Sequence, residues 1–296
     1  MTFSPTTSIP EFTPTMLVGG FVFPESPRWH KGMLWFSDIY GRKVYTVDAK
    51  GHATEKAFLR RRPSGLGFLP DGTPIVTTMG DRQVWRLEPS GPKPYADLSP
   101  LIGVHINDMV VDGHGRAYID KAASDPMSGD DYKPGYLVLV LPDGSPPRIV
   151  ADGLMNPNGI IVTPDEKTLI VAESHANRLS AYDIASDGSL LNHRIHTRLS
   201  GLAPDGICLD AEGCIWIGTV STGGFVRVRQ DGVVTHRIRT PGRWAVAPVL
   251  GGDDGRTLFM CTAETTPFDL RLLRSTGKSI GWIETARVDV PQAGWP

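Results

Sequence analysis

Four residues with oxygen-bearing side chains recur at long intervals along the chain and could together bind a cation. They are Glu25, Asn107, Asn158 and Asp205. Two carboxylates brought together with two carboxamides would repel each other and be costly to desolvate without a positive counter-charge. Oxygen donors without a thiolate suit a hard divalent ion, Ca²⁺ first, with Mg²⁺, Mn²⁺, Zn²⁺ and Fe²⁺ as alternatives. We call these residues the oxygen quartet and predict that they bind one such ion.

Each member of the quartet begins a copy of a repeated unit, in which an apolar run, a glycine-bearing turn and a second apolar run follow one another. The copies begin at residues 25, 64, 107, 158, 205 and 245, so 39 to 51 residues separate successive starts. A period of this length with several short strands is typical of a β-propeller. We predict an all-β fold, a six-bladed β-propeller with four-stranded blades around a central channel. It forms one domain at residues 14–296, after an N-terminal extension at 1–13.

The ring of blades has to close, and the strand-like run at residues 14–23, PTMLVGGFVF, lies outside the repeats. We predict that it supplies the outer strand of the last blade, which would leave no open sheet edge. The first strand of each blade lines the channel of a propeller, so the starts of the copies should meet at one end of it. Asn158-Gly159 and Asp205-Gly206 are also ordinary turn dipeptides, which is the competing interpretation.

Composition excludes several classes of protein. With 40% hydrophobic residues, 21% charged residues and a formal net charge of −2, the chain can form a normal buried core. The only basic cluster is Arg60-Arg61-Arg62, so we expect no nucleic acid partner. No apolar run is long enough to cross a membrane. The three cysteines, without a CxxC spacing, indicate core residues in a reducing compartment, and we expect a cytoplasmic protein.

Several segments resemble the SMP-30/gluconolactonase/luciferin-regenerating enzyme (LRE)-like family. They are ESPRW from residue 25, HIND from 105, PNG from 157, PDGICLDAEGCIWIG from 204 and the terminal VDVPQAGWP. The resemblance implies a six-bladed propeller and a metal-dependent hydrolase, in most members a lactonase. It also implies that Glu25, Asn158 and Asp205 are direct metal ligands. Asn107 would be a further ligand or a substrate-binding residue, and Asp205 would also act as general base.

Two departures from the family pattern concern the substrate. Members that act on sugar lactones carry arginine where this chain has His105, and Gly-Thr-Met where it has Asp120-Lys121-Ala122. We therefore expect a lactone that is not a simple sugar lactone, bound by Asn107, His105 and Lys121. The polar segment at residues 121–135 is either part of a substrate lid or a plain insertion.

These residues predict a metal-assisted hydrolysis. The ion would bind the substrate carbonyl oxygen, stabilise the developing oxyanion and lower the pKa of a bound water. Asp205 would take the proton from that water, and His105 would orient the substrate or relay a proton near neutral pH.

Two other interpretations stay open. A related propeller enzyme could act on phosphotriesters or catalyse a condensation, as strictosidine-synthase-like proteins do. A non-catalytic propeller could bind proteins at its rim and use the ion for structure only. The sequence leaves the oligomeric state open.

Overall fold

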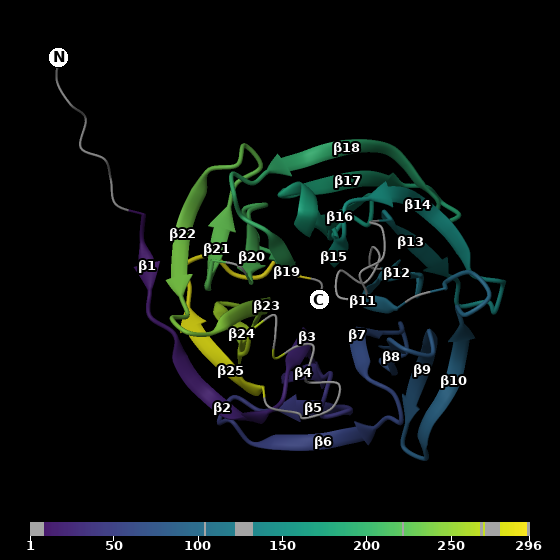
Figure 1. Ribbon diagram of the computed structural model, residues 1–296, viewed down its shortest axis with the longest axis horizontal. Helices are drawn as coiled ribbons and strands as arrows, with labels where there is room; N and C mark the ends of the chain where they lie inside the picture. The colour runs from purple at the N-terminus through teal and green to yellow at the C-terminus, as the bar shows by residue number, and fades with distance from the viewer. Residues whose placement is uncertain are drawn as a thin grey trace.

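The computed structural model describes residues 9–103, 105–121, 133–220, 222–266, 269 and 279–294. This part of the chain is nearly all strand, and its six sheets surround a central channel (Figure 1). The predicted six-bladed β-propeller is thereby confirmed. One short 3₁₀ turn, η1 (Ser174–Ala176), follows the second strand of blade four.

The first three blades each contain four antiparallel strands, which succeed one another from the channel outward. Blade one contains β3 (Pro24–His30), β4 (Met33–Asp38), β5 (Lys43–Val47) and β6 (Ala53–Phe58). Blade two contains β7 (Pro63–Phe68), β8 (Pro74–Thr78), β9 (Gln83–Glu88) and β10 (Gly91–Asp97). Blade three contains β11 (Ile106–Val111), β12 (Ala117–Lys121), β13 (Gly135–Val140) and β14 (Arg148–Leu154).

The other three blades follow the same plan. Blade four contains β15 (Pro157–Val162), β16 (Thr168–Glu173), β17 (Arg178–Ile184) and β18 (Leu190–Arg198). Blade five contains β19 (Pro204–Leu209), β20 (Ile215–Thr219), β21 (Gly224–Val228) and β22 (Val234–Arg239). Blade six contains β23 (Trp244–Gly251), β24 (Thr257–Glu264), β25 (Ile280–Arg287) and, outermost, β2 (Thr15–Phe21).

The N-terminal part of the chain closes the ring, as the sequence predicts, and also adds a strand that it does not predict. β2 pairs with β25 and completes blade six. β1 (Glu11–Phe12) pairs in parallel with β22, so blade five has five strands rather than four. The Phe12 ring stacks on His236 with centroids 5.4 Å apart, which anchors this added strand. The last residues of the expected extension therefore pair with the propeller.

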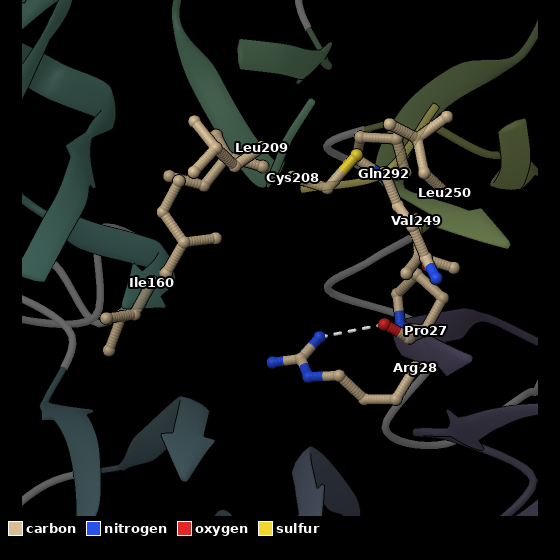
Figure 2. A pocket seen from close by; sticks show the side chains of 11 residues that line it. Pro27, Arg28, Ile160, Cys208, Leu209, Val249, Leu250 and Gln292 are labelled. Atoms are coloured by element: carbon tan, nitrogen blue, oxygen red, sulfur yellow. Dashed lines mark hydrogen bonds between the residues drawn. The ribbon is translucent and has the colours of Figure 1, made fainter. Parts of the chain in front are cut away.

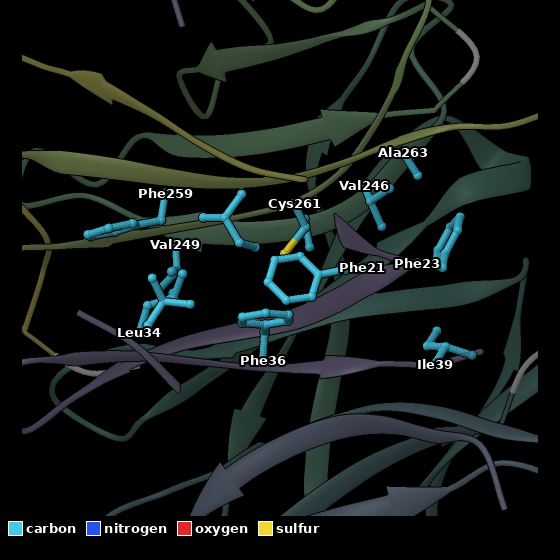
Figure 3. Close-up of a cluster of buried hydrophobic side chains, with 13 residues drawn as sticks. Phe21, Phe23, Leu34, Phe36, Ile39, Val246, Val249, Phe259, Cys261 and Ala263 are labelled. Atoms are coloured by element: carbon cyan, nitrogen blue, oxygen red, sulfur yellow. The ribbon is translucent and has the colours of Figure 1, made fainter. Parts of the chain in front are cut away.

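The hydrophobic core lies between the blades. Six clusters of buried side chains occur in the described part of the chain, and each contains residues of two neighbouring blades. In the cluster of Figure 3, Phe259 and Val249 of blade six pack against Leu34 and Phe36 of blade one. All three cysteines are free and buried, as expected for core residues. Packing between blades therefore holds the innermost strands in place around the channel.

Candidate functional site

The structure places every quartet member at the same position of its blade. Each is the second residue of an innermost strand: Glu25 of β3, Asn107 of β11, Asn158 of β15 and Asp205 of β19. In all six innermost strands, the pairing with the next strand shifts register at or just after this position. Such β-bulges redirect side chains and are common beside active sites.

The dipeptides Asn158-Gly159 and Asp205-Gly206 lie in strands, so the turn interpretation is wrong. Neither glycine has a positive φ. A Cβ atom on Gly159 would lie 2.7 Å from the backbone oxygen of Asp205, and one on Gly206 would lie 2.3 Å from Cβ of Ala247. The glycines therefore let the innermost strands of blades four, five and six approach closely, which brings Asn158 next to Asp205.

The two quartet carboxylates are buried close enough to repel each other. Glu25 is 4% exposed and Asp205 is 9% exposed. Burial and the charges of Asp205 and Asp108 raise the pKa of Glu25 well above its usual value. Burial and the charge of Asp108 raise the pKa of Asp205 to about 8, although the neighbouring Asn158 carboxamide opposes this. For both carboxylates to be ionised at neutral pH, a compensating positive charge is needed.

Arg28 supplies one such charge, and it pairs with a carboxylate that the sequence analysis did not single out. Its guanidinium reaches from blade one to Asp108 Oδ1 of blade three, at 3.2 Å, and donates to the carbonyl oxygen of Met109, at 2.6 Å. Asp108 Oδ1 also accepts from Ser26 Oγ at 3.0 Å. Ser26 has a φ of 51°. This left-handed conformation places its N–H 2.7 Å from the Glu25 carboxylate.

A further carboxylate beside the quartet is Asp120, which the sequence shows only as a departure from the family pattern. It is 0% exposed, and neither of its oxygens has a hydrogen-bond partner. Burial and the charge of Asp108 raise its pKa well above the usual value. Four carboxylates therefore lie in this part of the channel, with Arg28 as a cation paired to one of them.

The amide members of the quartet have oxygen atoms that fit a cation. Asn158 Oδ1 is buried without a hydrogen-bond partner. Asn107 Oδ1 accepts one hydrogen bond, from Ser64 Oγ at 2.9 Å. Its second lone pair is therefore available to a cation. Within the described residues, no group of three or more His, Cys, Asp or Glu side chains is spaced to hold a metal ion. A divalent ion here would therefore need the amide oxygens as well as Glu25 and Asp205, as the quartet provides.

His105 and Lys121, the other predicted site residues, have contacts of their own. His105 Nδ1 lies 3.4 Å from the carbonyl oxygen of Met79 in blade two. Lys121 is 6% exposed. Its Nζ donates to the Pro134 carbonyl oxygen at 3.4 Å and lies over the Tyr136 ring. Because neighbouring strand residues point to opposite faces, Asp120 rather than Lys121 faces the quartet.

A small cavity lies among the later residues of the innermost strands. Its volume is about 20 Å³, and Ile160, Leu209, Val249 and Arg28 are among its lining residues (Figure 2). Gln292 also lines it and forms a β-bridge with Asp210. Arg28 therefore lines this cavity and also pairs with Asp108 of the polar site.

Comparison with known proteins agrees with this architecture. The sequence model of the SMP-30/gluconolactonase/LRE-like region matches residues 23–264. A 6-deoxy-6-sulfogluconolactonase of Pseudomonas putida is 25% identical over 289 residues, which are 93% of this chain and 94% of the relative. Lactonase drp35 of Staphylococcus saprophyticus is 25% identical over 227 residues, 72% of this chain and 68% of the relative.

Among solved structures, a luciferin-regenerating enzyme is similar in fold, with a TM-score of 0.78 at 17% identity. The match covers 94% of this chain and 97% of that one. In the described part of the chain, no helix is both long and apolar enough to span a membrane.

Proposed function

Since the chain belongs to the SMP-30/gluconolactonase/LRE-like family, we propose that it is a divalent-metal-dependent hydrolase that opens a lactone ring. The observation that carries the proposal is the buried group of oxygen donors at equivalent positions of four blades, with the orphaned Asn158 Oδ1 among them. The names of two relatives, a sulfogluconolactonase and a lactonase, support lactone hydrolysis. The ion that fits the donors best is Ca²⁺.

In this proposal each residue has a defined task. The quartet would hold the ion through two carboxylates and two amide oxygens. When bound, a divalent ion supplies Lewis acidity at the substrate carbonyl and lowers the pKa of a bound water. Asp205 accepts the proton of the attacking water at its carboxylate oxygen. His105, which directly precedes β11 of blade three, orients the substrate. The contact of its Nδ1 with the Met79 carbonyl oxygen holds the ring in place.

The substrate we propose is a small lactone that is not a simple sugar lactone. The position that is arginine in sugar lactonases is His105 in this chain, which removes a bidentate donor for hydroxyl groups. Lys121, proposed with Asn107 as a substrate-binding residue, is the last residue of β12. The three free, buried cysteines support a reducing, cytoplasmic compartment.

A panel of aliphatic, aromatic and sugar lactones tests the proposal, with ring opening followed by a pH indicator. We expect proton release with at least one class of lactone, more rapid for non-sugar lactones. Treatment with a chelator should remove the activity, and adding Ca²⁺ back should restore it, because the Lewis acid and the activated water depend on the ion. Undiminished turnover by chelated protein would refute the metal mechanism, and no turnover of any lactone would refute the reaction class.

A further inference from the structure

Asp120 is a buried carboxylate that needs a physical explanation. On β12 it stands opposite the bulge of β11, because Lys121 pairs with Ile106 and Ile119 pairs with Met109. The two bulged residues that it faces are Asn107 and Asp108. Its side chain has no exposed surface and both oxygens lack a hydrogen-bond partner. A buried carboxylate without a partner is strongly unfavourable, and native proteins retain few such groups.

The other blades show that the fold does not require a carboxylate at this position. In each blade, one residue of the second strand pairs with the first residue of the innermost strand. The residue just before it is the equivalent of Asp120. These residues are Ser37, Thr77, Ala172, Gly218 and Thr262. The hydroxyl of Ser37 donates to the carbonyl oxygen of Ser64 at 2.7 Å, and that of Thr77 to the carbonyl oxygen of Asn107 at 2.9 Å. Neither oxygen of Asp120 makes such a bond, so Asp120 serves another purpose.

The surroundings of Asp120 offer it one side-chain donor within the site, the Asn107 carboxamide. The Asn107 carboxamide and the backbone N–H of Asp108 lie beside its carboxylate and act to lower its pKa. Arg28 is engaged with Asp108, Met109 and Pro27. Direct binding of one ion by Asp120 together with Glu25 and Asp205 is disfavoured, since no three such side chains in the described residues are spaced for it.

We propose that Asp120 is a positioning residue for Asn107: when the cation is bound, its carboxylate accepts the amide N–H of Asn107, so that Asn107 Oδ1 is held toward the cation. Ser64 Oγ already donates to this oxygen and fixes the carboxamide from the other side. A cation on Oδ1 polarises the amide and strengthens its N–H as a donor to a carboxylate. Groups that orient metal ligands in this way typically change metal affinity 10- to 100-fold. This inference rests on the proposed function, because it assumes that the quartet binds the ion.

The test is the affinity of purified protein for Ca²⁺, measured by titration calorimetry, with Mn²⁺ followed by electron paramagnetic resonance as a second probe. We expect Asp120→Asn to weaken binding about 10- to 100-fold. The matched control is Asp187→Asn, which removes an exposed carboxylate from the β17–β18 turn and should leave the affinity unchanged. If Asp120→Asn binds both ions as tightly as the wild type, the inference is wrong.

Thermal unfolding gives a second readout that does not depend on activity. Without the ion, Asp120→Asn should melt a few degrees higher than the wild type, because an unpaired buried carboxylate is removed. Saturating Ca²⁺ should raise the melting temperature of the variant by less than that of the wild type, because the variant binds the ion with lower affinity. If Asp120→Asn does not fold, Asp120→Ser, which copies Ser37 of blade one, is measured in its place. A lower melting temperature of both variants without the ion would show that Asp120 is a structural residue and would overturn the inference.

A mutant cycle tests whether Asp120 acts through Asn107. In an Asn107→Ala background, Asp120→Asn should cause no further loss of affinity, since the oriented ligand is already absent. A full additional loss would show that Asp120 acts on the ion directly and would overturn the positioning role. Absence of ion binding by the wild type would instead refute the metal site of the proposed function, so the two failures are distinguishable.

Discussion

Replacing Asp205 by alanine is expected to lower kcat/KM for lactone opening by at least about 10³-fold, because one residue loses two roles. Its carboxylate is a proposed ligand of the ion and the proposed acceptor of the proton from the attacking water, and general-base catalysis alone contributes about 10²- to 10⁴-fold. The measurement is the initial rate of proton release with the best lactone of the panel, at saturating Ca²⁺.

Two further variants separate chemistry from folding. Asp205→Asn keeps the shape of the side chain and a neutral oxygen, so it should bind the ion weakly and remain inactive. Asp187→Ala removes an exposed carboxylate that pairs with Arg148 and should turn over substrate like the wild type. Activity of Asp205→Ala within tenfold of the wild type, in protein with the normal melting temperature, would exclude Asp205 as base and ligand.

The second large effect is on stability and concerns Arg28. Replacing Arg28 by methionine is expected to lower the free energy of unfolding by about 3–5 kcal/mol, the cost of leaving a buried charge without its partner. Asp108, 4% exposed, would lose its ion pair while Glu25 and Asp205 remain close. The carbonyl oxygens of Pro27 and Met109 would also lose a donor. Urea unfolding in the presence of a chelator measures the change.

Controls show whether the charge or the packing is responsible. The double variant with Arg28→Met and Asp108→Asn should regain part of the lost stability, because the unpaired charge is gone. Arg229→Met removes an exposed ion pair with Asp231 and should not shift the urea midpoint measurably. Equal destabilisation in the single and double variants would attribute the effect to lost packing and would contradict the role of Arg28 as counter-cation.

The positions of the quartet could be predicted because they depend on the repeat. A hairpin pattern that recurs six times fixes both the blade count and the equivalent residue of each blade, so Glu25 and Asp205 could be matched although 180 residues separate them (205 − 25). The run at residues 14–23 could be assigned to blade six because the last blade needs an outer strand that the repeats do not supply.

Other features depend on contacts between residues far apart in sequence, and no local pattern reveals them. Asp108 follows Asn107 directly, but its importance comes from Arg28, 80 residues away. β1 contains only two residues, too few for a pattern, and it is held by stacking of Phe12 on His236. The directions in which the side chains of Asp120 and Lys121 point depend on the bulge in β11 opposite them, and no sequence pattern predicts that bulge.

The central claim is that one cation binds the oxygen quartet at the end of the channel, and the anomalous scattering of Mn²⁺ in a crystal of the protein tests it directly. The claim predicts one strong peak in the channel with an oxygen of Glu25, Asn107, Asn158 and Asp205 within about 2.6 Å of it. A channel without a peak, or a peak to which the quartet oxygens do not converge, would contradict the claim.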